Sequence, residues 1–253
     1  MKNRQIWTIA IGGLLFLLAV IAVPAGATMF TADGTNPETG QGLSASVEFL
    51  LVGGNLQVTL TNSGADVFAP SDVLTAVFFN IAGNPALSSE SALLNSGSTV
   101  LFGSAPGGIV GGEWAYGRGL AGAPGGANQG ISSSGLDDLF GGPTFPGDNL
   151  QGPPSGAVDG VQYGITSGLD NSTTGNQKVT GSEALIQNSV IFTLGGLPDG
   201  FTLDDISNVS FQYGTDLDEP NTTPVPEPGT LLLLGSGLVS IGIWGRKKFQ
   251  GRI

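Results

Sequence analysis

The side chains of this chain that could carry chemistry are carboxylates, because its 253 residues include neither His nor Cys. Without His there is no Ser-His-Asp triad, and the commonest acid–base group at neutral pH is missing. Without Cys there is no thiolate nucleophile, no disulfide and no thiolate metal site. A carboxylate-based enzyme acting on glycans is therefore the least favoured hypothesis, and we expect a protein without enzymatic activity.

Two pairs of adjacent acids, Asp137-Asp138 and Asp204-Asp205, do not by themselves form acid–base dyads. Neighbouring residues on a strand point to opposite faces of the sheet, whereas glycoside hydrolysis needs two carboxylates that face each other across a sugar. We expect Asp204-Asp205 to turn the chain into the strand that follows it.

Three further acids, Asp216, Asp218 and Glu219, have the alternating spacing of oxygen ligands that calcium favours. The chain has neither a complete EF-hand loop nor a GGxGxD repeat, so this pattern has low specificity. The alternative is a solvated acidic segment at the start of a linker. Calcium is the one cofactor that the sequence leaves open.

Trp114 and Tyr116, with Arg118 close by in a Gly-rich stretch, could form a small platform on which a sugar stacks. Burial of Trp114 as a core or loop anchor is the favoured alternative. Together with the calcium pattern, this platform makes a calcium-assisted carbohydrate-binding module the alternative function.

Charge is distributed unevenly along the chain. Residues 28–224 hold 19 acids against two bases, Arg118 and Lys178, which gives a formal charge of -17. A surface of this sign repels the phosphate backbone, so we expect no nucleic-acid partner.

The amino terminus has the order of a secretory signal peptide. Two cations precede an apolar stretch over residues 6–23, and small residues end in Ala25-Gly26-Ala27. This order predicts a signal helix in residues 1–27, recognition by Sec-type export machinery and cleavage after Ala27.

Residues 28–218 are predicted to form one β-rich domain. Eight short segments of β-branched and aromatic residues, bounded by turn residues, indicate an antiparallel β-sandwich or jelly-roll-like domain. The clearest two, residues 47–52 and 56–61, form a hairpin with its turn at Gly53-Gly54-Asn55. The other predicted strands are residues 73–81, 98–102, 113–116, 161–166, 189–194 and 208–213. Two-turn helices are predicted at residues 88–95 and 133–141.

Gly, Pro and Asn dominate residues 103–160, but apolar residues punctuate this stretch. A disordered linker would lack such anchors. We therefore expect a long, ordered, Gly-rich insertion that packs on the sheet through its aromatic residues. The anchors are Trp114, Ile131, Leu136, Leu139, Phe140, Phe145 and Leu150.

The carboxyl terminus combines three ordered elements after a predicted linker over residues 219–224. They are the triplet Pro226-Glu227-Pro228, an apolar run over residues 231–244, and the cations Arg246, Lys247 and Lys248. As a helix the run would be about 21 Å long, which is shorter than the ~30 Å hydrocarbon core. The cations would stay cytoplasmic. A short transmembrane helix between a rigid motif and a basic cluster indicates a transient stop in the membrane.

Residues 225–249 resemble the PEP-CTERM sorting signal of Gram-negative bacteria, in which a V-P-E-P motif, a hydrophobic segment and a basic cluster follow one another. The resemblance implies processing by an exosortase, an integral membrane transpeptidase-like cysteine protease. It implies a precursor held briefly in the inner membrane, and then a protein of the cell surface or extracellular matrix. Proteins with this signal are associated with exopolysaccharide and biofilm formation, so a structural or adhesive role with exopolysaccharide as partner is expected.

Overall fold

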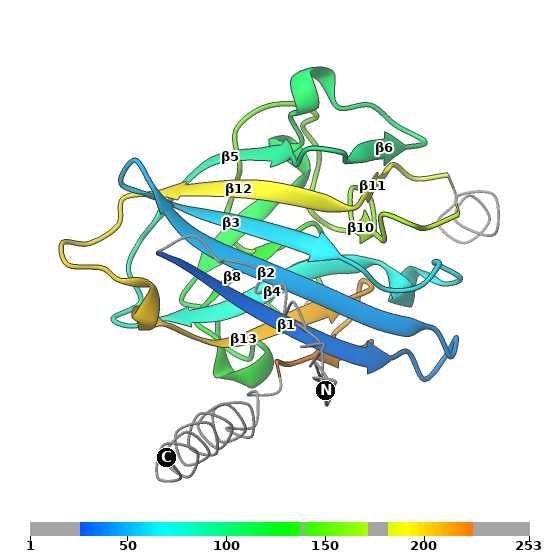
Figure 1. The fold of residues 1–253 in the computed structure, drawn as a ribbon, viewed down its shortest axis with the longest axis horizontal. Helices are drawn as coiled ribbons and strands as arrows, with labels where there is room; N and C mark the ends of the chain where they lie inside the picture. The colour runs from blue at the N-terminus through cyan, green and yellow to red at the C-terminus, as the bar shows by residue number, and fades with distance from the viewer. Residues whose placement is uncertain (1–25, 138–139, 172–181, 225–253) are drawn as a thin grey trace, which may run out of the picture.

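The computed structural model describes residues 26–137, 140–171 and 182–224 (Figure 1). This part of the chain is mainly β, with short 3-10 helices between the strands. The strands are β1 (Ala27–Thr35), β2 (Gly42–Val52), β3 (Asn55–Asn62), β4 (Leu74–Ile81), β5 (Ser88–Leu94), β6 (Thr99–Leu101), β7 (Ala115–Arg118), β8 (Gln129–Ser132), β9 (Asp148–Asn149), β10 (Ile165–Thr166), β11 (Leu185–Gln187), β12 (Ser189–Gly195), β13 (Ile206–Tyr213) and β14 (Asn221–Thr222). The 3-10 helices are η1 (Pro70–Asp72), η2 (Pro106–Gly108), η3 (Gly111–Glu113), η4 (Pro124–Gly126) and η5 (Leu203–Asp205).

The strands form two sheets. The first has the order β1-β2-β3-β12-β5 and is antiparallel throughout. The second has the order β6-β11-β10-β4-β8-β7-β9, and β13 joins it by pairing with both β4 and β14. The prediction of a mainly β domain with antiparallel pairing is confirmed, with the parallel pair β10–β11 as a departure from it.

The predicted signal helix and short transmembrane helix lie outside the described residues. Among the helices of the described ranges, none is long and apolar enough to cross a membrane.

The predicted hairpin is present as β2 and β3, and its register places Val52 opposite Asn55. The two residues between them, Gly53 and Gly54, have φ angles of 58° and 85°. A two-residue turn of this kind needs positive φ at both positions, which glycine adopts without strain. Every second side chain of β3 is buried, as its alternating sequence predicts.

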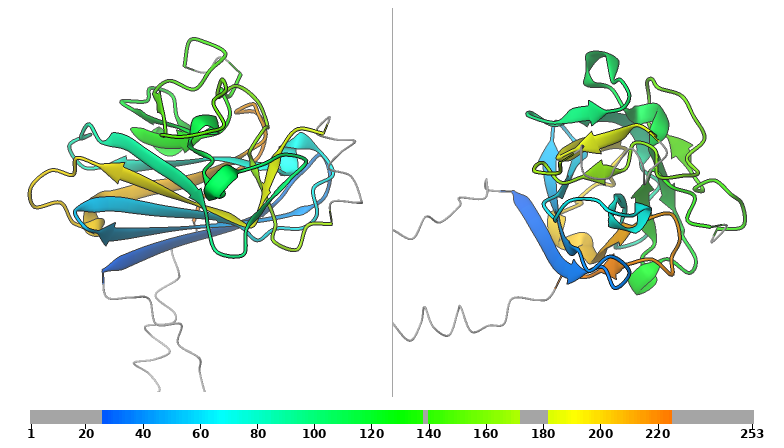
Figure 2. Two further views of the ribbon diagram at one scale, coloured as in Figure 1. Left: turned by 90° about the horizontal axis from the view of Figure 1, so that it is seen from above. Right: turned by 90° about the vertical axis from the view of Figure 1, so that its right-hand side faces the viewer.

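The main hydrophobic core lies between the two sheets, which pack face to face (Figure 2). Phe49 of β2 meets Phe79 of β4 edge to face, with ring centroids 5.2 Å apart. Phe192 of β12 contacts Trp114, which precedes β7, with the two rings tilted by 56° and their centroids 4.9 Å apart. Aromatic contacts from both sheets therefore fill the space between them.

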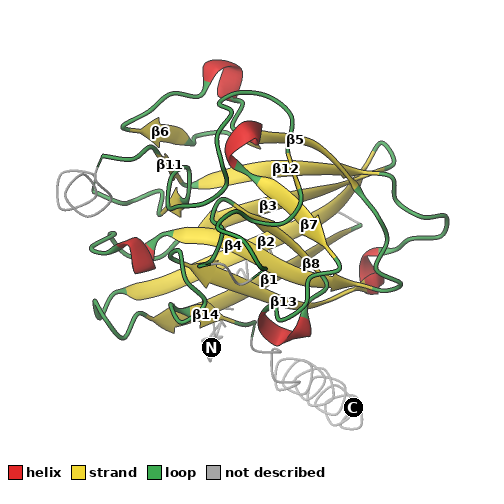
Figure 3. Cartoon of the chain, turned by 180° about the vertical axis from the view of Figure 1, so that it is seen from behind, coloured by secondary structure: helices red, strands yellow, loops and turns green. Residues whose placement is uncertain are grey.

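Strand β4 is buried on both of its faces, unlike the half-exposed strands of the first sheet. Phe79 points into the main core, whereas Phe78 belongs to a second cluster on the other side of the sheet. There Phe140 and Phe145 lie 6.5 Å and 6.4 Å from the Phe78 ring. The Gly-rich segment 103–160 thus covers the outer face of the second sheet (Figure 3).

This packing confirms that the Gly-rich segment is held on the sheet by aromatic anchors. Phe140, Phe145 and Leu136 lie in the outer cluster, while Trp114 lies in the main core. Leu139 is outside the described residues. This segment also contributes β7, β8 and β9 to the sheet, of which the sequence predicted only a strand at residues 113–116, which overlaps β7.

Both predicted helices are wrong where the structure describes them. Residues 88–95 form strand β5, because pairing with β12 and burial of Ala92 override the local helix propensity. In the other segment, Leu136 and Asp137 have positive φ angles, which a right-handed helix does not contain. Residues 138–139 are not described.

Several strand boundaries also differ from the prediction. Residues 113–116 divide between η3 and β7, and only Ile165–Thr166 of residues 161–166 is a strand. The largest omission is β1, a strand of nine residues that the sequence analysis did not assign.

Glycine in the outer segment allows backbones to touch. A Cβ atom on Gly112 would lie 1.5 Å from the carbonyl oxygen of Pro154, and one on Gly135 would lie 1.9 Å from that of Pro143. Both contacts are to backbone, which cannot move away as a flexible side chain can. Within the Gly-rich segment, glycine therefore allows backbones to pack directly against each other, in addition to the packing of its aromatic rings on the sheet.

Gly112→Ala is expected to lower the free energy of unfolding by about 1–3 kcal/mol or more, because the added methyl group overlaps the Pro154 carbonyl. Gly42→Ala is the matched control, since a Cβ atom there meets nothing within 4 Å. Denaturant titration of the purified protein measures both. Equal stability of the two variants would contradict the close backbone contact.

Candidate functional site

The carboxyl-terminal end of the fold is a short hairpin that joins the domain to the predicted sorting segment. Residues Phe211 and Gln212 of β13 pair with Thr222 and Asn221 of β14. The buried Gln212 amide donates to the carbonyl oxygens of Asp216 at 2.9 Å and Glu219 at 3.1 Å. Its oxygen accepts a hydrogen bond from Asn221 at 3.0 Å. This side chain ties the connecting turn and β14 to the sheet.

Glu219 closes the same turn from the other side. Its Oε2 atom accepts hydrogen bonds from the backbone N–H groups of Thr215 and Asp216, the latter at 2.7 Å. Burial raises the pKa of Glu219, and the two hydrogen bonds partly oppose that rise. Strand β14 and Glu219 fall in residues 219–224, the segment interpreted as a linker, so part of that segment is folded onto the domain.

The three acids of the calcium pattern do not converge on a common point. The Glu219 carboxylate is engaged by the turn, and Asp216 Oδ1 accepts from the backbone N–H of Asp218 at 2.9 Å. In the described ranges, no group of three or more acids has an arrangement that could hold a metal ion. The alternating spacing of Asp216 and Asp218 is explained by the shape of the turn.

Trp114 and Tyr116 lie inside the protein and cannot serve as an exposed stacking platform. Trp114 is fully buried and Tyr116 is 4% exposed. The Tyr116 hydroxyl donates to Gln129 Oε1, and burial is the main cause that raises its pKa to about 12. The structure corrects the glycan-contact hypothesis for these two residues and agrees with the alternative that Trp114 anchors the core.

The acid pairs have different surroundings. Asp205 Oδ2 accepts from the backbone N–H of Thr202 at 2.8 Å, which caps η5 just before β13, as predicted. Asp137 lines a polar pocket of about 330 Å³ together with Asp159 and Asp216. Asp138 is not described. No sequence pattern indicates this pocket, because its acids are far apart along the chain and come together only in the folded protein.

Glu113 is the most deeply buried acid near this pocket, at 7% exposed. A Cβ atom on Gly156 would lie 2.7 Å from its Oε1 atom, so the carboxylate is held against the backbone. Burial raises the pKa of Glu113, and the negative charge of Asp159 raises it further. No cationic partner compensates for its charge in the described part of the outer layer, where Arg118 is the one base.

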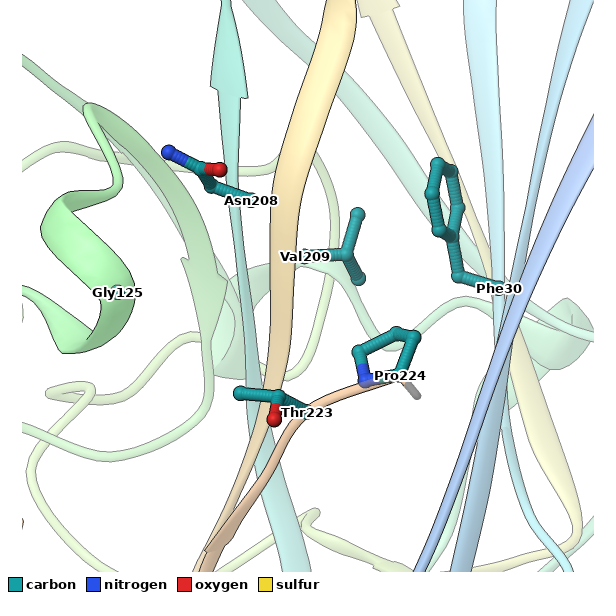
Figure 4. A pocket seen from close by; sticks show the side chains of 6 residues that line it. All are labelled: Phe30, Gly125, Asn208, Val209, Thr223 and Pro224. Carbon is teal, nitrogen blue, oxygen red and sulfur yellow. The ribbon is translucent and has the colours of Figure 1, made fainter. Parts of the chain in front are cut away.

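A second depression, which we call the exit groove, lies where the described chain ends. It has a volume of about 430 Å³ and is lined by Phe30, Gly125, Asn208, Val209, Thr223 and Pro224. In Figure 4, Phe30 of β1 and Val209 of β13 point toward one another across it, and Pro224 lies between them. Three apolar side chains from both sheets and the carboxyl-terminal segment therefore share one surface.

Of the predicted sites at the two ends of the chain, the structure describes Ala27 alone. Ala27, the predicted cleavage position, is the first residue of β1 and lies opposite Leu50 of β2. Cleavage after it stays a prediction. Pro226, Glu227, Pro228 and the cations Arg246, Lys247 and Lys248 lie outside the described residues.

These features define an acidic β domain whose last described strand, β14, ends two residues before residue 224. The tail matches the family model of the PEP-CTERM protein-sorting motif over residues 224–247. The chain therefore carries a PEP-CTERM protein-sorting motif, as its sequence predicted. Neither a curated protein nor a solved structure matches it.

Glu113→Gln is expected to raise the melting temperature at pH 7.5 and to have little effect below about pH 4. In the folded protein the pKa of Glu113 is higher than its value of about 4.3 in the unfolded chain. The folded state therefore loses stability as the pH rises from about 4.3 through the pKa of the folded protein, where Glu113 becomes charged. The neutral amide avoids that loss. Thermal unfolding at both pH values measures the difference. The control is Asp199→Asn, because Asp199 is an exposed acid. A stabilisation that is equal at both pH values would contradict this explanation.

Proposed function

We propose that this chain is an exported, non-enzymatic structural or adhesive protein of the cell surface or extracellular matrix. The sorting motif makes it a substrate of exosortase and implies a precursor that passes through the membrane. Residues 1–27 direct Sec-type export in this proposal and are removed after Ala27. The protein needs no cofactor for this role.

The observation that carries the proposal is the position of the motif. Strand β14 ends at Thr222, and the matched motif begins at residue 224. The domain is therefore attached almost directly to a segment that is read and cut. Such a connection suits a protein whose folded domain is itself the delivered product.

The use of the buried acids supports a structural role. Asp72, which is 4% exposed, accepts hydrogen bonds from Asn36 Nδ2 at 2.7 Å and from the Thr39 hydroxyl at 2.8 Å. Its other oxygen accepts from the backbone N–H groups of Phe68 and Ala69. An acid with four donors has its lone pairs committed to holding loops together, which leaves little capacity for acid–base chemistry.

The charge of the domain supports an extracytoplasmic, matrix-facing role. In the described ranges, Arg118 is the one basic side chain among many acids. Strong negative charge keeps such a protein soluble and hydrated and disfavours nucleic acid as a partner. An exopolysaccharide is the partner that we propose, through polar surface contacts and not through the buried Trp114 and Tyr116.

Replacing Pro226, Glu227 and Pro228 together with alanine is expected to block processing, because the enzyme loses the motif that it reads. The uncut precursor should accumulate in the membrane fraction, with at least a tenfold loss of the released form. Immunoblotting of membrane and extracellular fractions measures both species.

The matched control is the double variant Pro198→Ala with Asp199→Ala, which removes an exposed proline and acid from the domain surface. It should be processed like the unaltered protein. Normal release of the triple-alanine variant would overturn the sorting function.

A further inference from the structure

The exit groove is placed where a processing enzyme must work. Pro224 is both a wall of this groove and the first residue of the matched sorting motif. From Thr222, the last paired residue of β14, the chain needs four residues to reach Pro226. These span at most about 14 Å when fully extended. An enzyme that binds Pro226 to Pro228 is therefore brought against this side of the folded domain.

The strand beside the groove has an unused edge. Among the described strands, β1 pairs with β2 alone, so its other edge carries backbone groups without a strand partner. The opposite edge of the same sheet, β5, is covered by bridges from Ser91 to Gln151 and from Leu93 to Ile109. Among the described strands, the edge of β1 near Phe30 thus has no strand partner and lies next to the groove, whereas the end of β1 at Gly34 lies close to the Thr222 side chain of β14.

The two features together fit an extended peptide segment. An open strand edge supplies backbone hydrogen bonds to an added strand, and a neighbouring apolar pocket selects alternate side chains of that strand. Phe30 contributes to both, because it belongs to β1 and its ring forms one side of the groove. Its ring rests edge to face on Phe49 at 5.9 Å, which holds it in place.

We propose that the exit groove and the free edge of β1 form a docking surface for an extended, apolar extracytoplasmic segment of the exosortase. The inference rests on the proposed function, since it assumes that this enzyme binds the motif. The enzyme then recognises the folded domain as well as the tail. A second copy of the chain is the other occupant that an open edge could accept, and the experiment below distinguishes the two.

The test places the photo-cross-linking amino acid p-benzoylphenylalanine at position 30 of the full-length precursor. The precursor is expressed in cells that carry an exosortase whose cysteine nucleophile has been replaced, so that the complex persists. The same substitution at Phe68 is the matched control, because this phenylalanine is 47% exposed and does not line the groove. Irradiation should cross-link position 30 to the enzyme at least ten times more than position 68.

A second measurement covers the case in which the bulky residue prevents folding. Phe30→Leu keeps an apolar side chain and should slow precursor processing at least threefold in cells with active enzyme, while Phe68→Leu should not. Thermal unfolding of both variants verifies that they are folded.

Three outcomes overturn the docking surface: equal cross-linking at both positions, cross-linking of position 30 to a second copy of the chain, or unchanged processing of folded Phe30→Leu. These results would leave the sorting function intact if the triple-alanine variant still fails to be processed. If that variant is processed normally, the sorting function fails, and the docking surface fails with it.

Discussion

The burial of β4 on both faces is the constraint on which the rest of the structure depends. One face completes the core between the two sheets, and the other needs a cover that neither sheet supplies. The Gly-rich segment provides that cover through Phe140 and Phe145. A chain without Cys has no disulfides to stabilise it, so its stability comes from these two apolar layers and the hydrogen bonds around them.

Buried polar side chains hold together loops and turns that lie outside the two apolar layers. Asp72 joins the loop after β1 to the turn before β4, and Gln212 joins the last turn to its own strand. Both are buried, so each unsatisfied atom would carry the full cost of desolvation. In effect, single side chains with several partners take the place of covalent cross-links at the ends of the sheets.

The sequence predicted those elements whose pattern is local. The β2–β3 hairpin was evident because alternation and a Gly-Gly turn coincide, and β12 and β13 were evident from their β-branched and aromatic residues. Strand β5 was mistaken for a helix because its pairing with β12 depends on residues nearly a hundred positions away. Strand β1 was missed because it begins at Ala27, the last residue of the predicted signal.

The sites show the same division between local and long-range information. The sorting motif is contiguous in sequence, so the chain alone identified it. The exit groove combines Phe30, Val209 and Pro224, and no sequence pattern links these positions. For Trp114 the sequence left both a stacking platform and the favoured core anchor open, and its burial against Phe192 agrees with the anchor.

The pairing of β4 with β13 also determines when the domain can finish folding. Ile81 lies opposite Ile206, and the edge strand β14 follows β13 at once. Strands β1 to β3 pair with their neighbours in the sequence, whereas β4 pairs with β8 on one side and needs β13, near the end of the domain, on the other. The second sheet is therefore complete only when almost the whole domain is available to fold. The strand that completes the fold and the sorting motif that starts at residue 224 therefore lie close together in the sequence, so nearly the same length of chain is needed for both.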